Sequence, residues 1–169
     1  MQLIRANHQP SGGDGNISFE DLQCYKLALD VMVNAHQVAA ALPPVEKYDL
    51  VQQMRRASKA ISANIAEGYG RFHYLDTLRF YSIARGSLNE VRNHIITARL
   101  LEYIDESYYQ QFTELMRETE KVLNGLMRYV REQQRGANLY KNNVLRETSG
   151  IYETEFVDYL GEPDSNEQP

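Results

Sequence analysis

The stretch that decides the fold is QQMRRASKAISANIAEGYGR, residues 52–71. Apolar residues recur at helical spacing from just before this stretch to near its end: Leu50, Met54, Ala57, Ile61 and Ile65. Arg55, Arg56 and Lys59 lie off that stripe. Gly68 follows the last apolar residue, where helices commonly end in a left-handed residue that glycine adopts without steric penalty. The stretch therefore predicts a helix that packs through one face, carries basic side chains beside it and stops at Gly68.

Three further stretches repeat apolar residues in alternating steps of three and four, a spacing typical of helices that pack in bundles. The first opens at Ser18 and has the seam Leu22, Tyr25, Leu29, Met32, His36 and Ala39. Residues 74–101 have the seam Thr77, Tyr81, Ala84, Leu88, Val91, Ile95 and Ala98. Residues 106–134 have the seam Phe112, Met116, Thr119, Leu123, Leu126 and Val130. With a helix over 47–67, these stretches predict an all-α fold, an antiparallel up-and-down four-helix bundle.

Polar residues, prolines and a glycine mark particular positions in these helices. Ser18, with Asp21 three residues later, forms a capping-box-like pair at the start of the first helix. Pro43-Pro44 ends that helix because proline lacks the backbone donor, and Asp105 is expected to cap the fourth. Gly86 lies inside the third helix, where glycine costs about 1 kcal/mol relative to alanine. We therefore expect a neighbouring backbone to approach closely at Gly86.

Composition divides the chain into three parts. Residues 1–17 are polar and glycine-rich and predict a flexible arm. The bundle is expected over 18–135, and residues 136–169 form an acidic tail, partly disordered or docking on a partner. The tail holds two basic and seven acidic residues and so carries the whole net charge of −5, whereas residues 52–99 hold eight basic and three acidic residues. An acidic tail thus follows a body with a basic middle.

Several classes of function lack their usual sequence signals. No apolar run approaches the roughly 18 to 20 residues that span a bilayer, and the first residues do not resemble a signal peptide. A lone cysteine, Cys24, excludes an intramolecular disulfide and fits a reducing cytoplasm. Glu90 and His94 are spaced by four, rather than by the three of a di-iron motif. We therefore expect a cytoplasmic protein with no membrane association, no metal or cofactor and no catalytic site.

Basic residues fall on two helical stripes. Arg85, Arg92 and Arg99 follow one another at steps of seven on the third helix, and Arg117, Lys121 and Arg128 line the fourth. Arginine matches the geometry of phosphate, and rows of such residues supply the sequence-independent part of nucleic-acid affinity. The candidate nucleic-acid-binding residues are Arg55, Arg56, Lys59, Arg71, Arg85, Arg92, Arg99, Arg117, Lys121 and Arg128. The alternative is that both stripes pair with nearby glutamates and form ordinary solvated faces.

Two further residues invite a structural interpretation. Glu67 lies in the last turn of its helix, where a carboxylate opposes the helix dipole. We therefore expect it to pair with an arginine of the third helix, Arg79 or Arg85. His36 falls on the first apolar seam and is interpreted as a histidine of the core or of an interface.

These motifs resemble those of a known family. Residues 64–71, NIAEGYGR, and residues 83–88, IARGSL, look like the two signatures of bacterial four-helix-bundle proteins named for the 23S rRNA intervening sequence. The opening Phe19–Leu22 and Tyr25 are similar to the usual start of that family. The residues of the structural motif are Asn64, Glu67, Gly68, Gly70 and Gly86. The resemblance covers about residues 18–133.

The match has departures. Ala60 and Ser62 stand where the family commonly has serine and proline, which should leave the helix more regular without changing the fold. The arm and the tail lie outside the usual length of the family. The resemblance implies a homo-oligomer, often a five-fold ring. It also implies a relation to the accessory variability protein of diversity-generating retroelements, a basic pentamer that works with a reverse transcriptase and its RNA.

Two hypotheses of function follow. The first is a non-enzymatic homo-oligomeric scaffold, a pentamer by resemblance, that binds RNA or DNA or assists a nucleic-acid enzyme such as a reverse transcriptase. The second is a protein–protein adaptor that uses the bundle ring and the aromatic, acidic tail at 136–169 without binding nucleic acid.

Overall fold

The structure is a computed structural model that describes residues 1–5, His8 and 18–135. Within these ranges it is all-α, with four helices and no strand: α1 (Gln23–Ala41), α2 (Leu50–Tyr69), α3 (Tyr74–Leu100) and α4 (Glu106–Arg135). Two short 3₁₀ turns, η1 (Phe19–Asp21) and η2 (Pro44–Tyr48), precede α1 and α2. The predicted acidic tail over 136–169 lies outside the described residues.

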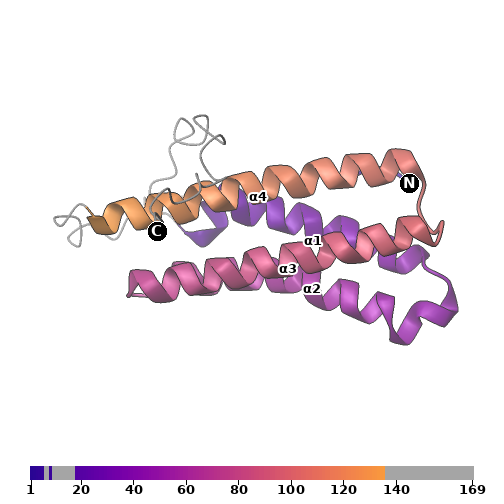
Figure 1. Ribbon diagram of the computed structural model, residues 1–169, viewed down its shortest axis with the longest axis horizontal. Helices are drawn as coiled ribbons and strands as arrows, with labels where there is room; N and C mark the ends of the chain where they lie inside the picture. Colours follow the sequence, from indigo (N-terminus) through magenta and orange to yellow (C-terminus); the bar gives the residue numbers. More distant parts are fainter. Residues whose placement is uncertain (6–7, 9–17, 136–169) are drawn as a thin grey trace, which may run out of the picture.

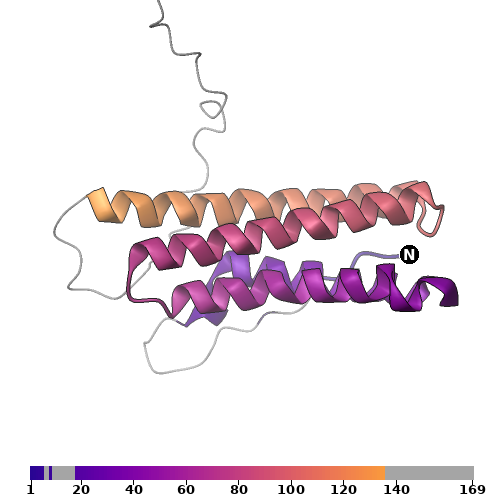
Figure 2. The same ribbon diagram turned by 60° about the horizontal axis from the view of Figure 1, so that its bottom comes forward.

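The four helices lie side by side along most of their length (Figure 1). Helix α2 packs against α1 and α3, and α4 packs against α3 and α1. Figure 2 shows the same helices from a second direction, again lying along one another. The core is therefore enclosed by helices that meet in the order α1, α2, α3 and α4, with contact between the last and the first.

The apolar seams predicted on α2, α3 and α4 are all buried, which confirms them. The seam predicted on α1 is wrong in its middle, because Tyr25, Leu29, Met32 and His36 are only half-buried. The residues of α1 that point into the core are instead Cys24, Leu27, Ala28, Val31, Ala35 and Val38. Polar Asp30 and Asn34 are also buried on α1. A prediction from apolar residues alone leaves these two positions out and therefore places the middle of the core face of α1 on the wrong residues.

Both predicted helix caps are present, but one of them caps a different element from the one predicted. Ser18 and Asp21 form the capping box, but it caps the 3₁₀ turn η1, and α1 begins only at Gln23. Asp105 caps α4, since its Oδ1 accepts the backbone N–H of Tyr108 at 2.8 Å. That hydrogen bond is the largest of the contacts that lower the pKa of the Asp105 carboxyl.

Gly68 does not end α2 in a left-handed conformation, so this prediction is wrong. The helix continues to Tyr69, and Gly70 closes it in the right-handed region with φ −76°. Gly68 is required for a different reason, because a Cβ added there would lie 2.6 Å from Cε1 of Tyr81 on α3. Glycine therefore allows α2 and α3 to approach closely at this level.

The prediction for Gly86 is also wrong. A Cβ added at Gly86 would meet no atom within 4 Å, so no neighbouring backbone approaches this position among the residues that the structure describes. Gly86 is exposed near the middle of α3. The close approach falls at Gly68 instead.

The flexible arm predicted over 1–17 needs correction for part of its length. Residues 1–5 and His8 lie against the bundle, and Leu3 packs on the core. Ile4 exchanges hydrogen bonds with Asn34 of α1, and Arg5 pairs with Glu118 of α4. Residues 6–7 and 9–17 lie outside the described ranges. The start of the chain thus docks on the bundle, because buried polar groups of α1 provide its partners.

Two matched glycine substitutions test this account of the helices. Gly68→Ala should lower the free energy of unfolding by about 1 to 3 kcal/mol, because the new Cβ overlaps the fully buried ring of Tyr81. Gly86→Ala should raise it by up to about 1 kcal/mol, because alanine favours a helix and the site is open. Urea unfolding followed by circular dichroism measures both changes. Equal effects of the two substitutions would contradict the assigned roles.

Candidate nucleic-acid interface

The ten candidate basic residues are divided among three helices and the turn after α2. Arg55, Arg56 and Lys59 lie on α2, and Arg71 follows the end of that helix. The other six lie on α3 and α4: Arg85, Arg92, Arg99, Arg117, Lys121 and Arg128. We call the first three residues the α2 basic patch, and Arg85, Arg92 and Arg99 the α3 stripe.

The three arginines of the α3 stripe all reach across to α4. Arg85 donates to Oδ1 of Asn124 at 3.3 Å. Arg92 donates to Oε2 of Glu120 at 2.7 Å and Arg99 to Oε2 of Glu106 at 2.6 Å. Arg99 also lies over the ring of Tyr109, 4.7 Å from its centroid. Two of the three charges are therefore neutralised by carboxylates of α4, as the alternative interpretation of this stripe expected.

The predicted stripe on α4 is exposed and in part locally paired. Arg117 donates to Oε2 of Glu114, one turn earlier, at 3.4 Å. Both side chains are largely exposed, and such pairs contribute little to stability. Lys121 and Arg128 are exposed on the same helix. Phosphate can reach these side chains, but acidic neighbours of α4 reduce the positive potential around Arg117.

The α2 basic patch has a different electrostatic environment. Arg56 and Lys59 are exposed and Arg55 is half-buried. Over the described ranges, no carboxylate forms an ion pair with any of the three. The Nε of Arg55 is buried, and among those residues it has no hydrogen-bond partner. The patch therefore presents positive charge that the bundle itself does not neutralise.

The positive charge of the α2 basic patch affects the pKa of His36 on α1. Burial lowers the pKa of its imidazole, and the charges of Arg55 and Lys59 lower it further. The half-buried His36 therefore belongs beside the α2 basic patch and is not a core residue. The sequence signal that could have shown this is the short connection at Pro43-Pro44, which brings the last turns of α1 beside the first turns of α2.

The end of α2 forms a second charged feature. Arg71 donates to Oε1 of Glu67 and lies over the ring of Phe80, 4.6 Å from its centroid. The partner of Glu67 is therefore Arg71, and the predicted pairing with Arg79 or Arg85 is wrong. The chain turns directly after α2, so the arginine four residues on reaches Glu67 first.

A surface hollow of about 350 Å³ adjoins this ion pair. Its lining residues are Ala63, Ala66, Glu67, Gly70 and Arg71. Asn64 is not among these lining residues, and its side-chain amide donates to the carbonyl of Ala60 at 2.7 Å. The motif at 64–71 therefore has mainly structural roles, which are a helix end, an ion pair and a close contact with α3.

Other kinds of site find little support in the described part of the chain. No group of three or more His, Cys, Asp and Glu side chains there could hold a metal ion. His94 and Glu90 lie 3.8 Å apart, one turn from each other on α3. None of the described helices has the length and the apolar composition that crossing a membrane requires.

The pKa of His36 predicts a pH dependence of stability. The unfolded imidazole takes up a proton near pH 6.5, whereas the folded imidazole does so only at lower pH. The contribution of His36 to stability should therefore be constant above about pH 6.5 and fall as the pH decreases below it. His36→Gln should remove this part of the loss in urea unfolding at pH 7.5 and 5.5. The matched control is His73→Gln at an exposed histidine. An unchanged pH dependence in His36→Gln would contradict the assignment.

The chain matches the model of a known protein family. The model of the family described as 23S rRNA-intervening sequence protein matches residues 20–125. A search among curated proteins gives no significant match. The matched range covers more than half of the chain and runs from η1 into α4, so it includes the α2 basic patch and the motif at 64–71. The chain therefore belongs to the 23S rRNA-intervening sequence protein family.

Proposed function

We propose that this protein is a non-enzymatic, homo-oligomeric scaffold, built on an antiparallel up-and-down bundle, that binds nucleic acid through the α2 basic patch. The observation that carries the proposal is the uncompensated positive charge of that patch. Arg55, Arg56 and Lys59 have no ion-paired carboxylate within the described residues, and two of them lower the pKa of His36. Cations without internal partners are free to neutralise phosphates.

The description of the family supports RNA as the nucleic acid, since it names an rRNA intervening sequence. A flexible or structured RNA offers phosphates along its backbone, which arginine and lysine recognise without reading its sequence. We further propose a cytoplasmic location, and a reverse transcriptase or another nucleic-acid enzyme as the protein partner. These last two proposals rest on the resemblance and on the single cysteine, Cys24, which the structure places in the core.

Exposed apolar side chains support self-association. Helix α3 carries several large apolar residues that the single chain leaves exposed: Leu75, Ile83, Ile96 and Leu100. On α1, Tyr25, Leu29 and Met32 are half-buried at heptad spacing. Apolar rows of this kind are buried when helices of separate chains pack together. A five-fold ring is the form that the resemblance implies.

The protein–protein adaptor is the second candidate, and a specific observation favours it. The glutamates of α4 neutralise Arg92 and Arg99, which leaves the exposed apolar residues of α3 as the more distinctive feature of that face. On this view the acidic tail at 136–169 provides a contact element. Removing residues 137–169 should then abolish capture of a partner, but spare or strengthen binding of RNA.

Neutralisation of charge tests the α2 basic patch directly. In a salt series with a labelled structured RNA, Arg56→Gln/Lys59→Gln should weaken binding about tenfold or more at low salt. It should also reduce the slope of log affinity against log salt by about 1.5 to 2, because two phosphate contacts are lost. The matched control is Arg85→Gln/Arg92→Gln, which should lose less because Glu120 already neutralises Arg92. Unchanged affinity in the α2 variant would sink the assignment of this surface.

Substitutions on α3 test self-association. Light scattering of the full chain should give the mass of an oligomer, and Ile83→Asp/Leu100→Asp should lower that mass without unfolding the bundle, because both side chains are exposed. Val45→Asp on η2, where the side chain is also exposed, is the control and should leave the mass unchanged. A monomeric wild-type protein would contradict the ring.

A further inference from the structure

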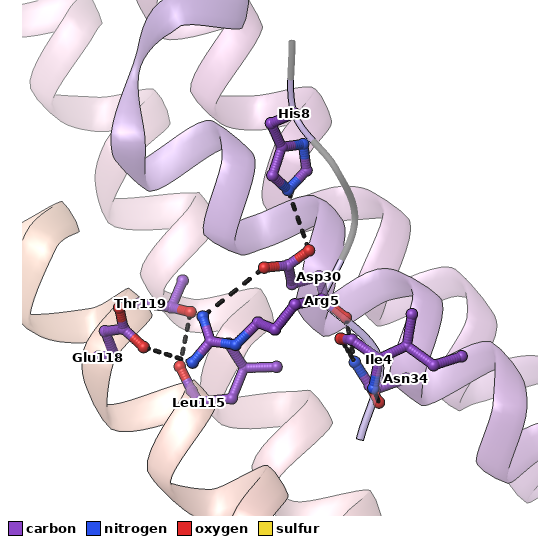
Figure 3. A network of polar contacts seen from close by, with 8 residues as sticks. All are labelled: Ile4, Arg5, His8, Asp30, Asn34, Leu115, Glu118 and Thr119. Carbon is purple, nitrogen blue, oxygen red and sulfur yellow. Dashed lines mark hydrogen bonds and ion pairs between the residues drawn. The ribbon is translucent and has the colours of Figure 1, made fainter. Parts of the chain in front are cut away.

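The beginning of the chain lies against α1 and α4, where it contacts Asn34, Asp30 and Glu118. Figure 3 shows Ile4, Arg5 and His8 from this segment facing Asp30 and Asn34 of α1 and Glu118 of α4. The segment adds Leu3 to the core beneath it. Residues more than a hundred positions apart in the sequence are therefore joined through one polar network. We call residues 1–5 and His8 the N-terminal segment, and the face of α1 and α4 that carries Asp30, Asn34 and Glu118 its docking surface.

Asn34 recognises the backbone of the segment rather than a side chain. Its Oδ1 accepts the N–H of Ile4 at 2.9 Å, and its Nδ2 donates to the carbonyl of Ile4 at 2.7 Å. The same amide is fixed from within the bundle, since Nδ2 donates to the carbonyl of Asp30 and Tyr108 donates to Oδ1. Asn34 is fully buried. This amide is a preorganised partner for one residue of an extended chain.

The positions that follow Ile4 are recognised through the charges of their side chains. Arg5 donates to Oε2 of Glu118 at 2.7 Å, and its other terminal nitrogen lies 3.6 Å from Oδ2 of Asp30. His8 Nε2 lies 3.0 Å from Oδ1 of the same carboxylate, whose side chain is only 5% exposed. The docking surface therefore combines an apolar position, a backbone pairing position and an acidic pair for a cationic side chain. This is the chemistry of a site for an extended basic peptide.

We propose that this docking surface is an exchange site, in which the N-terminal segment of a second copy of the chain takes the place of the chain's own segment. An exchanged segment makes the same contacts with Asn34, Asp30 and Glu118, so exchange changes no local interaction. Nine residues, 9–17, separate His8 from Ser18. A connection of this length spans up to roughly 33 Å, whereas the rise along α1 from its start to Asp30 is roughly 11 Å.

Exchange depends on the local concentration of the competing segments. Within one chain, the short connection gives the segment a high effective concentration, of millimolar order. A second copy competes at this level only where subunits are held together, so exchange at equilibrium rests on the homo-oligomer proposed above. The recognition itself rests only on the contacts of the segment with the docking surface. Exchange would link neighbouring subunits without enlarging their helix–helix contacts.

Cross-linking of two full-length variants tests the proposal. One variant carries Arg5→Cys and the other Glu118→Cys, at positions whose side chains are 48% and 43% exposed. After the two proteins are mixed and treated with a short bismaleimide, a denaturing gel should show a covalent dimer. Each variant treated alone is the background control, because the remaining Cys24 is buried.

A matched proline pair separates exchange from mere proximity. Ile4→Pro in the Arg5→Cys chain removes the N–H that donates to Asn34 and should lower the yield of cross-linked dimer roughly tenfold. Gln2→Pro, at an exposed residue of the same segment, should leave the yield unchanged. Both changes lie outside the helices, so the bundle remains folded. A yield that Ile4→Pro does not lower would overturn the proposal.

The remaining outcomes distinguish this proposal from the proposed function. A third variant carries both Arg5→Cys and Glu118→Cys in one chain. If light scattering shows an oligomer, but only this double variant forms a cross-link and the link is within one chain, the segment stays on its own chain. Exchange is then overturned and the scaffold stands. If the protein is a monomer and the mixture gives no covalent dimer, both the proposed homo-oligomer and the proposed exchange are contradicted. A covalent dimer that depends on Ile4 supports exchange, whatever the result of the RNA assay.

Discussion

The close contact between Gly68 and the ring of Tyr81 is the constraint on which the arrangement of the helices depends. Tyr81 is fully buried, and no side chain larger than a hydrogen atom fits between its ring and α2 at this level. This contact draws the end of α2 onto the first half of α3. Beside it, Arg71 closes the turn by pairing with Glu67 and lying over Phe80. The motif that looks functional in the sequence is thus explained largely by packing.

The positions of the helices decide which charges are available to a ligand. Helix α3 lies beside α4, so its arginines meet the glutamates and the asparagine of that helix and act mainly as links between the two. Helix α2 lies beside α1, where the charges of Arg55 and Lys59 lower the pKa of His36, and no described carboxylate forms an ion pair with them. Two basic rows that look equivalent in the sequence therefore differ in their potential, because their neighbours differ.

Buried polar groups give α1 a second role. Asp30 and Asn34 interrupt its apolar face, and burial of such groups is costly unless they are hydrogen-bonded. Tyr108 of α4 and the start of the chain provide those bonds, and burial raises the pKa of Tyr108 to about 12. One network therefore holds the first and the last helix together and determines where the chain begins to pack.

The sequence by itself determined the four helices, the caps at Ser18 and Asp105, and the buried faces of α2, α3 and α4, because these follow from local spacing and local hydrogen bonds. It also contained the motifs of the family. Only the tertiary structure decided the core face of α1, the reason for Gly68, the partner of Glu67 and the docking of the first residues. Each of these depends on which side chain of another helix lies opposite. Periodicity along a single helix contains no information about that neighbour.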